Sequence, residues 1–453
     1  MPSKKITLYS LVLLLLWSVS VSAQDRDTAP EDAFYPDLQA DEDMKMLRAI
    51  REPLSISYGG WITPVIIDER SGTALTSSVT ISKLWIKSTL WRNSYVYIRG
   101  KDVFFYVVNE EDIDIDDTEN LVDLDVGFIA LSNERNTLNL FVGRKFFTLG
   151  TGLVVNGRGD GGEITFYSRF IDIKLFGLYT GLLKKDNNPY GLSDKDITDG
   201  AKRIFAGGTL QKEFLNQAFY LLGVAQIDQG DEEEGTKSRY QSQYYGAGLT
   251  GTISDMIEYY AEFVYEMGKS YLSGTEEEED IQAYAANAGI RYYIDVPLNP
   301  TLIIQYAYGS GDEDRTSTRL PTANQMDTDT GFLSFGTYVG GYALRPELSN
   351  IHIARGGFSF TPFSFTKSRS LKRMNIMVKY SYYMKDKPEG VINYGEATLE
   401  EREIGHGIDA SLRWGILSDF SFFVTYAIFL PGKAYDSSEP NRNFTMGGFN
   451  IIF

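Results

Sequence analysis

The residues with the clearest chemical potential in this sequence are basic side chains that recur at every second or fourth position of short segments. Lys83 and Lys87 form one such pair, Arg99 and Lys101 form the next, and Arg413 occupies a comparable place near the C-terminus. Ammonium and guanidinium groups bind carboxylates through charge-assisted hydrogen bonds. On one common surface, these side chains would therefore bind or guide an anionic solute.

Catalytic chemistry has less support. The sequence has no cysteine, which excludes thiol nucleophiles and cysteine-ligated metals, and its two histidines are His352 and His406. A serine hydrolase would need a Ser–His pair, and no Gly-x-Ser-x-Gly elbow occurs in the chain. We therefore expect no enzymatic activity, no cofactor and no bound metal.

The acidic excess of the chain is concentrated in short runs. A formal net charge of −18 disfavours a nucleic-acid partner. The run 110–117 has aspartates at the opening spacing of a calcium loop, but its residue 117 is aspartate where such a loop requires glycine. Solvated loops between structured segments are therefore the favoured interpretation.

The N-terminus has the layout of a secretory signal peptide. Two lysines precede an apolar run over residues 6–17, and small residues follow up to Ala23, where we expect cleavage. The apolar run is shorter than the roughly 20 residues that cross a bilayer as a helix. We assign residues 1–23 to the signal peptide and residues 24–53, which lack alternation, to a periplasmic or lumen-lying segment.

The elements that must position the basic residues are β-strands. Residues 54–453 repeat one unit, a segment with alternating apolar and polar side chains followed by a turn or a polar loop, and transmembrane strands need about 9–11 residues. In 257–267 one face is apolar and the other carries Glu258, Glu262 and Glu266. Such charges are costly against lipid and tolerated in a wet lumen. The pattern predicts an all-β protein, a single transmembrane antiparallel β-barrel.

The number of strands follows from counting these segments. Nineteen candidates occur, including 54–64 and 331–342. Bacterial single-chain barrels have even strand numbers, so we predict about 18 strands and expect the error at 54–64 or at an irregular central segment. A barrel of 16–18 strands leaves an aqueous channel. The size therefore indicates a pore.

Three stretches resemble the alginate export family of outer-membrane porins. The first is VGRKFFTLGTGLVVN at 142–156 with FYSRFIDI at 166–173. The second is YGSGDEDR at 308–315 with NIHIARGGFSFTP at 350–362, and the third is GHGIDASLRW at 405–414 with YAIFLPGKAY at 426–435. The chain also ends in Phe453, which resembles the aromatic last residue that the barrel assembly machinery of the outer membrane recognises.

The resemblance implies an eighteen-stranded porin in the bacterial outer membrane, surrounded by lipid and lipopolysaccharide. It would pass an anionic polysaccharide, or small solutes, by passive diffusion. It also implies a constriction with cationic side chains that pair with solute carboxylates. Strand parity and the family-like stretches together give the candidate pore-lining residues Lys83, Lys87, Arg99, Arg144, Arg158, Arg169, Arg291, Arg355, Lys379, Asp409 and Arg413.

Two alternatives remain open at this stage. Each arginine could pair with an acidic residue across the lumen and only stiffen the wall. The protein could also be a general or cation-preferring porin, with no polysaccharide role, in which Glu258, Glu262 and Glu266 set the selectivity. The solute, the direction of transport, the oligomeric state and a gating role for the loop 311–330 do not follow from the sequence.

Overall fold

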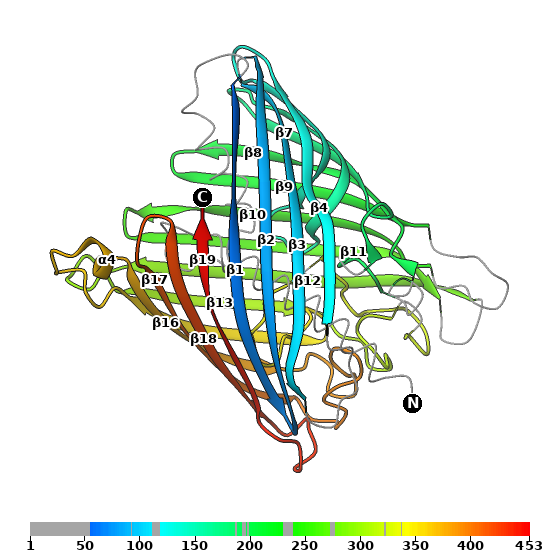
Figure 1. The fold of residues 1–453 in the computed structure, drawn as a ribbon. Coiled ribbons are helices and arrows are strands. Elements are labelled where there is room, and N and C mark those ends of the chain that lie inside the picture. Colours follow the sequence, from blue (N-terminus) through cyan, green and yellow to red (C-terminus); the bar gives the residue numbers. More distant parts are fainter. Residues whose placement is uncertain are drawn as a thin grey trace.

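Alternating side chains fold the chain into eighteen antiparallel strands that close into a barrel (Figure 1). The computed structural model describes residues 55–453 except residues 92 and 337 and the segments 111–117, 186–187, 193–195, 197–198, 230–238, 272–276 and 321–322. The predicted signal peptide 1–23, the segment 24–53 and the acidic residues 111–117 lie outside the described residues.

The first nine wall strands are β1 (Ile56–Ser71), β2 (Thr73–Trp91), β3 (Ser94–Glu110), β4 (Thr118–Ser132), β5 (Leu138–Thr148), β6 (Val155–Phe166), β7 (Asp172–Tyr179), β8 (Arg203–Phe214) and β9 (Gln217–Asp228). The other nine are β10 (Gln241–Ser254), β11 (Ile257–Tyr271), β12 (Glu278–Tyr293), β13 (Thr301–Gly309), β15 (Ile351–Phe360), β16 (Met374–Met384), β17 (Glu403–Gly415), β18 (Phe420–Pro431) and β19 (Arg442–Ile452). Each pairs with its neighbours in chain order, and β1 pairs with both β2 and β19, which closes the sheet. The predicted barrel is confirmed.

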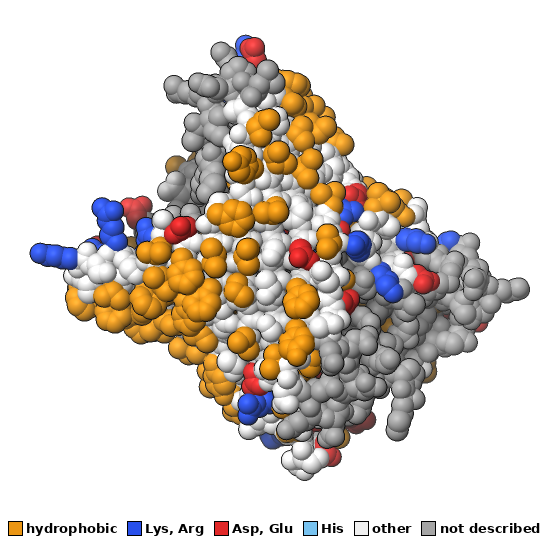
Figure 2. All heavy atoms as spheres, viewed as in Figure 1, with side chains coloured by type: hydrophobic (Ala, Val, Ile, Leu, Met, Phe, Trp, Pro, Cys, Tyr) orange, Lys and Arg blue, Asp and Glu red, His pale blue; other side chains and the backbone are white. Residues whose placement is uncertain are grey.

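The outer face of the wall is apolar, as the alternation predicts. On β11, Phe263 is 50% exposed and Met267 is 41% exposed, whereas Glu262 and Glu266, each the residue just before one of them, are buried. Figure 2 shows hydrophobic side chains spread over the outer face of the described strands, with few charges among them. The apolar face meets lipid, so charged side chains on the strands are directed into the lumen.

A short helix, α4 (Arg369–Lys372), lies in the connection between β15 and β16. No helix in the described part of the chain has the length and the apolar character that a membrane crossing needs.

The two ends of the barrel differ in their connections. Residues 133–137, 215–216 and 416–419 are short turns at one end, and Phe453 lies at that end, where its backbone bonds to Gly60 on β1. The connection 310–350 is the longest at the other end. Outer-membrane barrels place short turns in the periplasm and long loops outside the cell. This convention makes the end with Phe453 the periplasmic one.

Two segments leave the wall and enter the lumen. The tip segment, residues 149–154 between β5 and β6, reaches β11 and β12 on the opposite wall, where Thr151 contacts Glu262 and Asn287. The strap segment, residues 329–345 of the β13–β15 connection, contains β14 (Phe335–Gly336), which pairs in parallel with β6. Both segments narrow the lumen.

The strap segment accounts for the nineteenth strand candidate. The candidate 331–342 is the irregular central segment at which an error was expected, and it is not a wall strand. Its apolar residues Phe332, Leu333 and Phe335 are buried inside the lumen and not against lipid. A short apolar run has the same pattern in both settings. The other segment at which the error was expected, 54–64, belongs to β1.

Candidate functional site

Six basic side chains line the inner wall of β2–β6, and we call them the basic wall: Lys83, Lys87, Arg99, Lys101, Arg144 and Arg158. None is more than 8% exposed. Alternation positions the lysines and arginine of β2 and β3 on one face, and the strand register sets Lys83 directly opposite Lys101. Like charges directly opposite each other destabilise a sheet. A pairing of this kind needs nearby anions.

Two aspartates of β4 supply these anions. Asp125 lies 2.8 Å from Arg99 Nε and 3.3 Å from Lys83 Nζ. Arg158 Nη1 lies 3.2 Å from an oxygen of Asp123 and 3.1 Å from one of Asp125. Arg99 and Arg158 are therefore paired with aspartates of a nearby strand of the same wall.

Arg144 occupies a seam between two strands. β4 pairs with β5 over Gly127–Ser132, and next to this stretch Arg144 Nη1 donates to the Leu124 carbonyl at 3.0 Å. The same guanidinium makes two hydrogen bonds of 2.9 Å to Asp160 on β6. Arg144 thus satisfies a backbone carbonyl of β4 and adds a positive charge to the lumen.

Aromatic rings support the basic wall. The ring of Trp61 on β1 lies 5.5 Å from Lys83 Nζ and 5.3 Å from the guanidinium carbon of Arg99, and Lys87 Nζ lies 4.6 Å from the ring of Tyr95. Such rings attract cations through their quadrupoles. With Asp123, Asp125 and Asp160, this described cluster contains six basic and three acidic side chains. Its formal charge is positive.

A second group of charged residues lies on β15–β17. Lys379 and Asp409 are register partners, and both are buried. Arg355 donates to Ser381 Oγ at 2.9 Å and to the carbonyl of Gly340 in the strap segment. Arg355 therefore connects the barrel wall to the segment that crosses the lumen.

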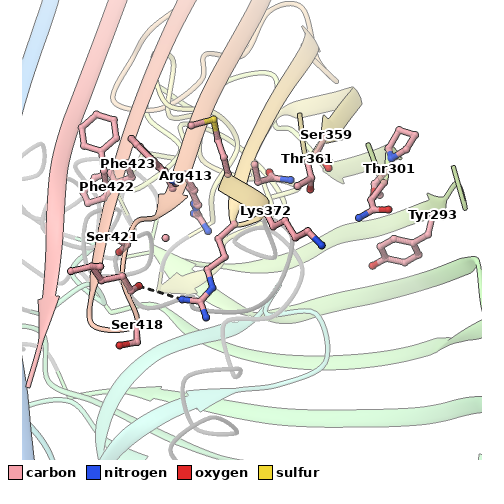
Figure 3. Close-up of a pocket in the computed structure, with 18 of the residues that line it drawn as sticks. Tyr293, Thr301, Ser359, Thr361, Lys372, Arg413, Ser418, Ser421, Phe422 and Phe423 are labelled. Atoms are coloured by element: carbon pink, nitrogen blue, oxygen red, sulfur yellow. Dashed lines mark hydrogen bonds between the residues drawn. The ribbon is translucent and has the colours of Figure 1, made fainter. Parts of the chain in front are cut away.

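A cavity of about 990 Å³ opens at the periplasmic end of the lumen (Figure 3). Arg413 and Lys372 line it from β17 and α4, and hydroxyl-bearing residues such as Thr301 line the facing side. Arg373, which also lines the cavity, donates a hydrogen bond to the Leu417 carbonyl at 3.4 Å. The cavity offers a solute both cationic and hydroxyl groups.

Two other predicted pore-lining residues have different surroundings. Arg291 on β12 is buried, and its Nη1 lies 3.9 Å from Glu258 Oε2, which also accepts a hydrogen bond from the Tyr293 hydroxyl. Arg169 is not on the wall. It lies in the exposed turn between β6 and β7, where its carbonyl accepts a hydrogen bond from Lys212. The family-like stretch that suggested Arg169 extends past the end of the strand.

Glu262 and Glu266 on β11 do not face open lumen. Glu262 Oε2 accepts hydrogen bonds from the backbone N–H of Thr151 (2.8 Å) and the hydroxyl of Tyr220 (2.5 Å). Glu266 accepts the backbone N–H of Leu333 at 2.9 Å. Both carboxylates hold the segments that enter the lumen.

Some functional residues have no signal in the sequence analysis. Arg203, which is fully buried, bonds to Asp228 at 2.8 Å and lies 5.3 Å from the ring of Phe335 in the strap segment. Asp160 and Thr151 were also missed. Asp160 and Arg203 pair with residues of neighbouring strands, and Thr151 meets Glu262, which is 111 positions away. Alternation within one strand does not identify such partners.

Both histidines lie on the lipid-facing side near the extracellular end. His352 Nδ1 is 2.7 Å from the Tyr306 hydroxyl, and His406 Nδ1 is 2.7 Å from the Tyr380 hydroxyl. Their Nε2 atoms lie near Asp386 and Glu403. Rings with a polar atom at one end, such as these tyrosines and histidines, are suited to the boundary between lipid and water.

A closed apolar-faced barrel with a charged, narrowed lumen defines an outer-membrane β-barrel channel. The model of the alginate export family matches residues 215–448, slightly more than half of the chain, and the chain belongs to this family. The resemblance seen in the sequence is thereby confirmed. A comparison with curated proteins gives no match.

Solved structures of outer-membrane proteins from Pseudomonas aeruginosa share the fold. OccK8 (OprE) has a TM-score of 0.57 at 10% identity and covers 88% of this chain and 98% of its own. OccK11 (OpdR) has a TM-score of 0.54 at 11% identity, with 89% and 98% covered. OprD has a TM-score of 0.52 at 12% identity, with 89% and 95% covered.

Proposed function

We propose that this outer-membrane channel prefers anionic, carboxylate-bearing solutes, including chains of uronate sugars. The basic wall is the observation that carries the proposal. Six basic side chains share one face of the lumen with three aspartates, and Lys83 and Lys101 lie directly opposite each other at a cost in stability. An arrangement that costs stability and places positive charge along a passage suits the binding of passing anions.

The shape of the lumen supports the same proposal. The tip segment and the strap segment narrow the passage. A solute that gives up part of its hydration shell in such a passage needs contacts that replace the lost water. Guanidinium and ammonium groups can replace water around a carboxylate. Arg355, Lys379 and Arg413 extend the basic side chains from this region to the periplasmic cavity.

Export and assembly belong to the proposal as well. A cleaved signal peptide at residues 1–23 would deliver the chain to the periplasm, and the terminal Phe453 would then be recognised by the barrel assembly machinery. Lipopolysaccharide would surround the extracellular half. The fold and the family support an outer-membrane location, and deletion of Phe453 should lower the amount of folded protein there.

A reversal-potential measurement in planar bilayers tests the anion preference. Under a KCl gradient we expect a potential of the sign that chloride permeation gives, and we expect K83Q/K101Q to reduce it. Lys212 on the outside of the barrel gives the matched control K212Q, which should leave the potential unchanged. A potential of the opposite sign would favour the cation-preferring porin.

Block of the channel current by added sugars tests the proposed preference for uronate chains. Oligouronate added to one side should reduce the KCl current, and a neutral oligosaccharide of equal length should reduce it less. Equal block by both sugars would show that carboxylates are not recognised. It would leave small anions as the remaining solutes.

A further inference from the structure

Two carboxylates on one strand contact the two segments that enter the lumen. Glu262 and Glu266 lie four residues apart on the inner face of β11. Glu262 bonds to the tip segment through Thr151, and Glu266 bonds to the strap segment through Leu333. We infer that these anchoring carboxylates are positioning residues that set the width of the pore.

The hydrogen bonds at Glu262 involve both backbone and side chain of the tip segment. Its Oε2 lies 2.8 Å from Thr151 N and its Oε1 lies 3.2 Å from Thr151 Oγ1. Asn287 on the neighbouring strand adds a contact of 3.2 Å to the same hydroxyl. Glu262 is 3% exposed, so these bonds are shielded from water and the carboxylate depends on them.

Gly150 shows how closely the tip segment approaches this carboxylate. Its φ of 54° lies in the left-handed region, and a Cβ on this residue would overlap Glu262 Oε2. Only glycine fits both the conformation and the space. The stretch 142–156 that resembles the family includes this glycine, and the contact gives a physical reason for its presence.

The second carboxylate has an equivalent arrangement. Glu266 Oε1 lies 2.6 Å from the Tyr240 hydroxyl and 2.8 Å from the Tyr244 hydroxyl, while its Oε2 accepts the N–H of Leu333. Tyr244 also lies 2.8 Å from the Leu333 carbonyl. The backbone N–H and the backbone carbonyl of Leu333 therefore both lie within hydrogen-bond distance of wall side chains.

The two segments also bond to each other. Phe335 N donates to the Val154 carbonyl at 2.9 Å, and the Cα of Gly336 comes so close to the Asn156 carbonyl that a Cβ would overlap it. Release of either carboxylate would therefore loosen both segments. A barrel of this strand number leaves an aqueous channel wherever such segments do not fill it.

The inference rests on the channel function and not on the preference for anions. Its test is single-channel conductance of the full-length protein, with liposome swelling by neutral sugars of increasing size. We expect E262A/E266A to raise the conductance several-fold and to admit larger sugars. E262Q/E266Q should have an intermediate effect, because the amide oxygen still accepts hydrogen bonds but carries no charge.

Glu213 on β8 provides a control outside this arrangement. It is exposed and accepts a hydrogen bond from Gln211 on its own strand. E213A should leave conductance and sugar size limit unchanged. Heat-modifiable mobility in gels confirms that each variant forms a barrel.

Two further variants keep the test independent of a folding defect. G150A would push the tip segment and Glu262 apart, and it should raise the conductance although no residue of β11 is substituted. The chain has no cysteine, so T151C/N287C in an E262A background can be joined by a short thiol-reactive crosslinker. Crosslinking should return the conductance to the wild-type value.

Wild-type conductance and sugar size limit in folded E262A/E266A would overturn the inference. The same conclusion would follow if E213A and E262A/E266A had equal effects. A changed reversal potential with unchanged conductance would count against this inference and leave the proposed anion preference standing.

Discussion

The basic wall of β2–β6 and the carboxylates of β11 use the same local pattern for different tasks. In both regions, charged residues recur on the inner face of a strand and are almost completely buried. The basic wall gathers six cations around three aspartates of the wall itself. Glu262 and Glu266 instead bond to backbone N–H groups of segments that lie in the lumen. Alternation determines that a charge faces inward, and its partner determines what the charge does.

The largest effect should come from removing an aspartate of the basic wall. Asp125 contacts Lys83, Arg99 and Arg158, so D125A leaves these cations buried beside one another. Removing one partner of a buried ion pair costs about 3–5 kcal/mol. We expect a loss of this size in urea unfolding of the detergent-solubilised barrel, followed by tryptophan fluorescence.

An exposed ion pair gives the control for this experiment. Asp280 lies 3.4 Å from Lys269, and both side chains are more than half exposed. D280A should change the free energy of unfolding by less than about 1 kcal/mol, because water screens the pair. Equal effects of D125A and D280A would contradict a tightly coupled basic wall.

A smaller loss of stability is expected at the carboxylates of β11. Y244F removes a hydroxyl that lies 2.8 Å from both Glu266 and the Leu333 carbonyl. Glu266 keeps the hydrogen bond from Tyr240, and leaving the buried Leu333 carbonyl without this donor costs about 1–3 kcal/mol. We also expect more current noise in single-channel records, because the strap segment loses one contact. Y245F, on the exposed neighbouring residue, should leave the noise unchanged.

The smallest effect should come from the aromatic support of the basic wall. Trp61 lies within 5.5 Å of Lys83 and 5.3 Å of Arg99, and cation–π contacts contribute about 0.5–2 kcal/mol each. W61L should therefore lower stability by a similar amount and keep the sign of the reversal potential. A change of sign would mean that Trp61, and not the cations, controls selectivity.

Most of the wall could be predicted from the sequence, because the lipid and the lumen impose one simple rule on every strand. The rule places Lys83 and Arg99 inward and gives the eighteen wall strands. It fails at 331–342, where apolar residues are buried in the lumen and not in lipid, and at Arg169, where the strand has already ended. In both cases the sequence has the alternation of a wall strand, but the residues lie outside the wall.

The candidate site was predictable only in part, because alternation gives the direction of a side chain and not its partner. The inward basic residues follow from parity, but their partners do not. Glu262 meets Thr151, which is 111 positions away, and Arg345 of the strap segment meets Glu69, which is 276 positions away. No local pattern encodes contacts between residues so distant in the chain.

The sequence by itself determined a membrane barrel, its approximate strand number and the inward orientation of its charged residues, because alternation against lipid is a local constraint. The tertiary structure decided which of these charges line the passage and which hold the tip and strap segments. Barrel closure brings β5, β11 and the strap segment together across the lumen, and only this closure makes the hydrogen bonds of Glu262 and Glu266 possible.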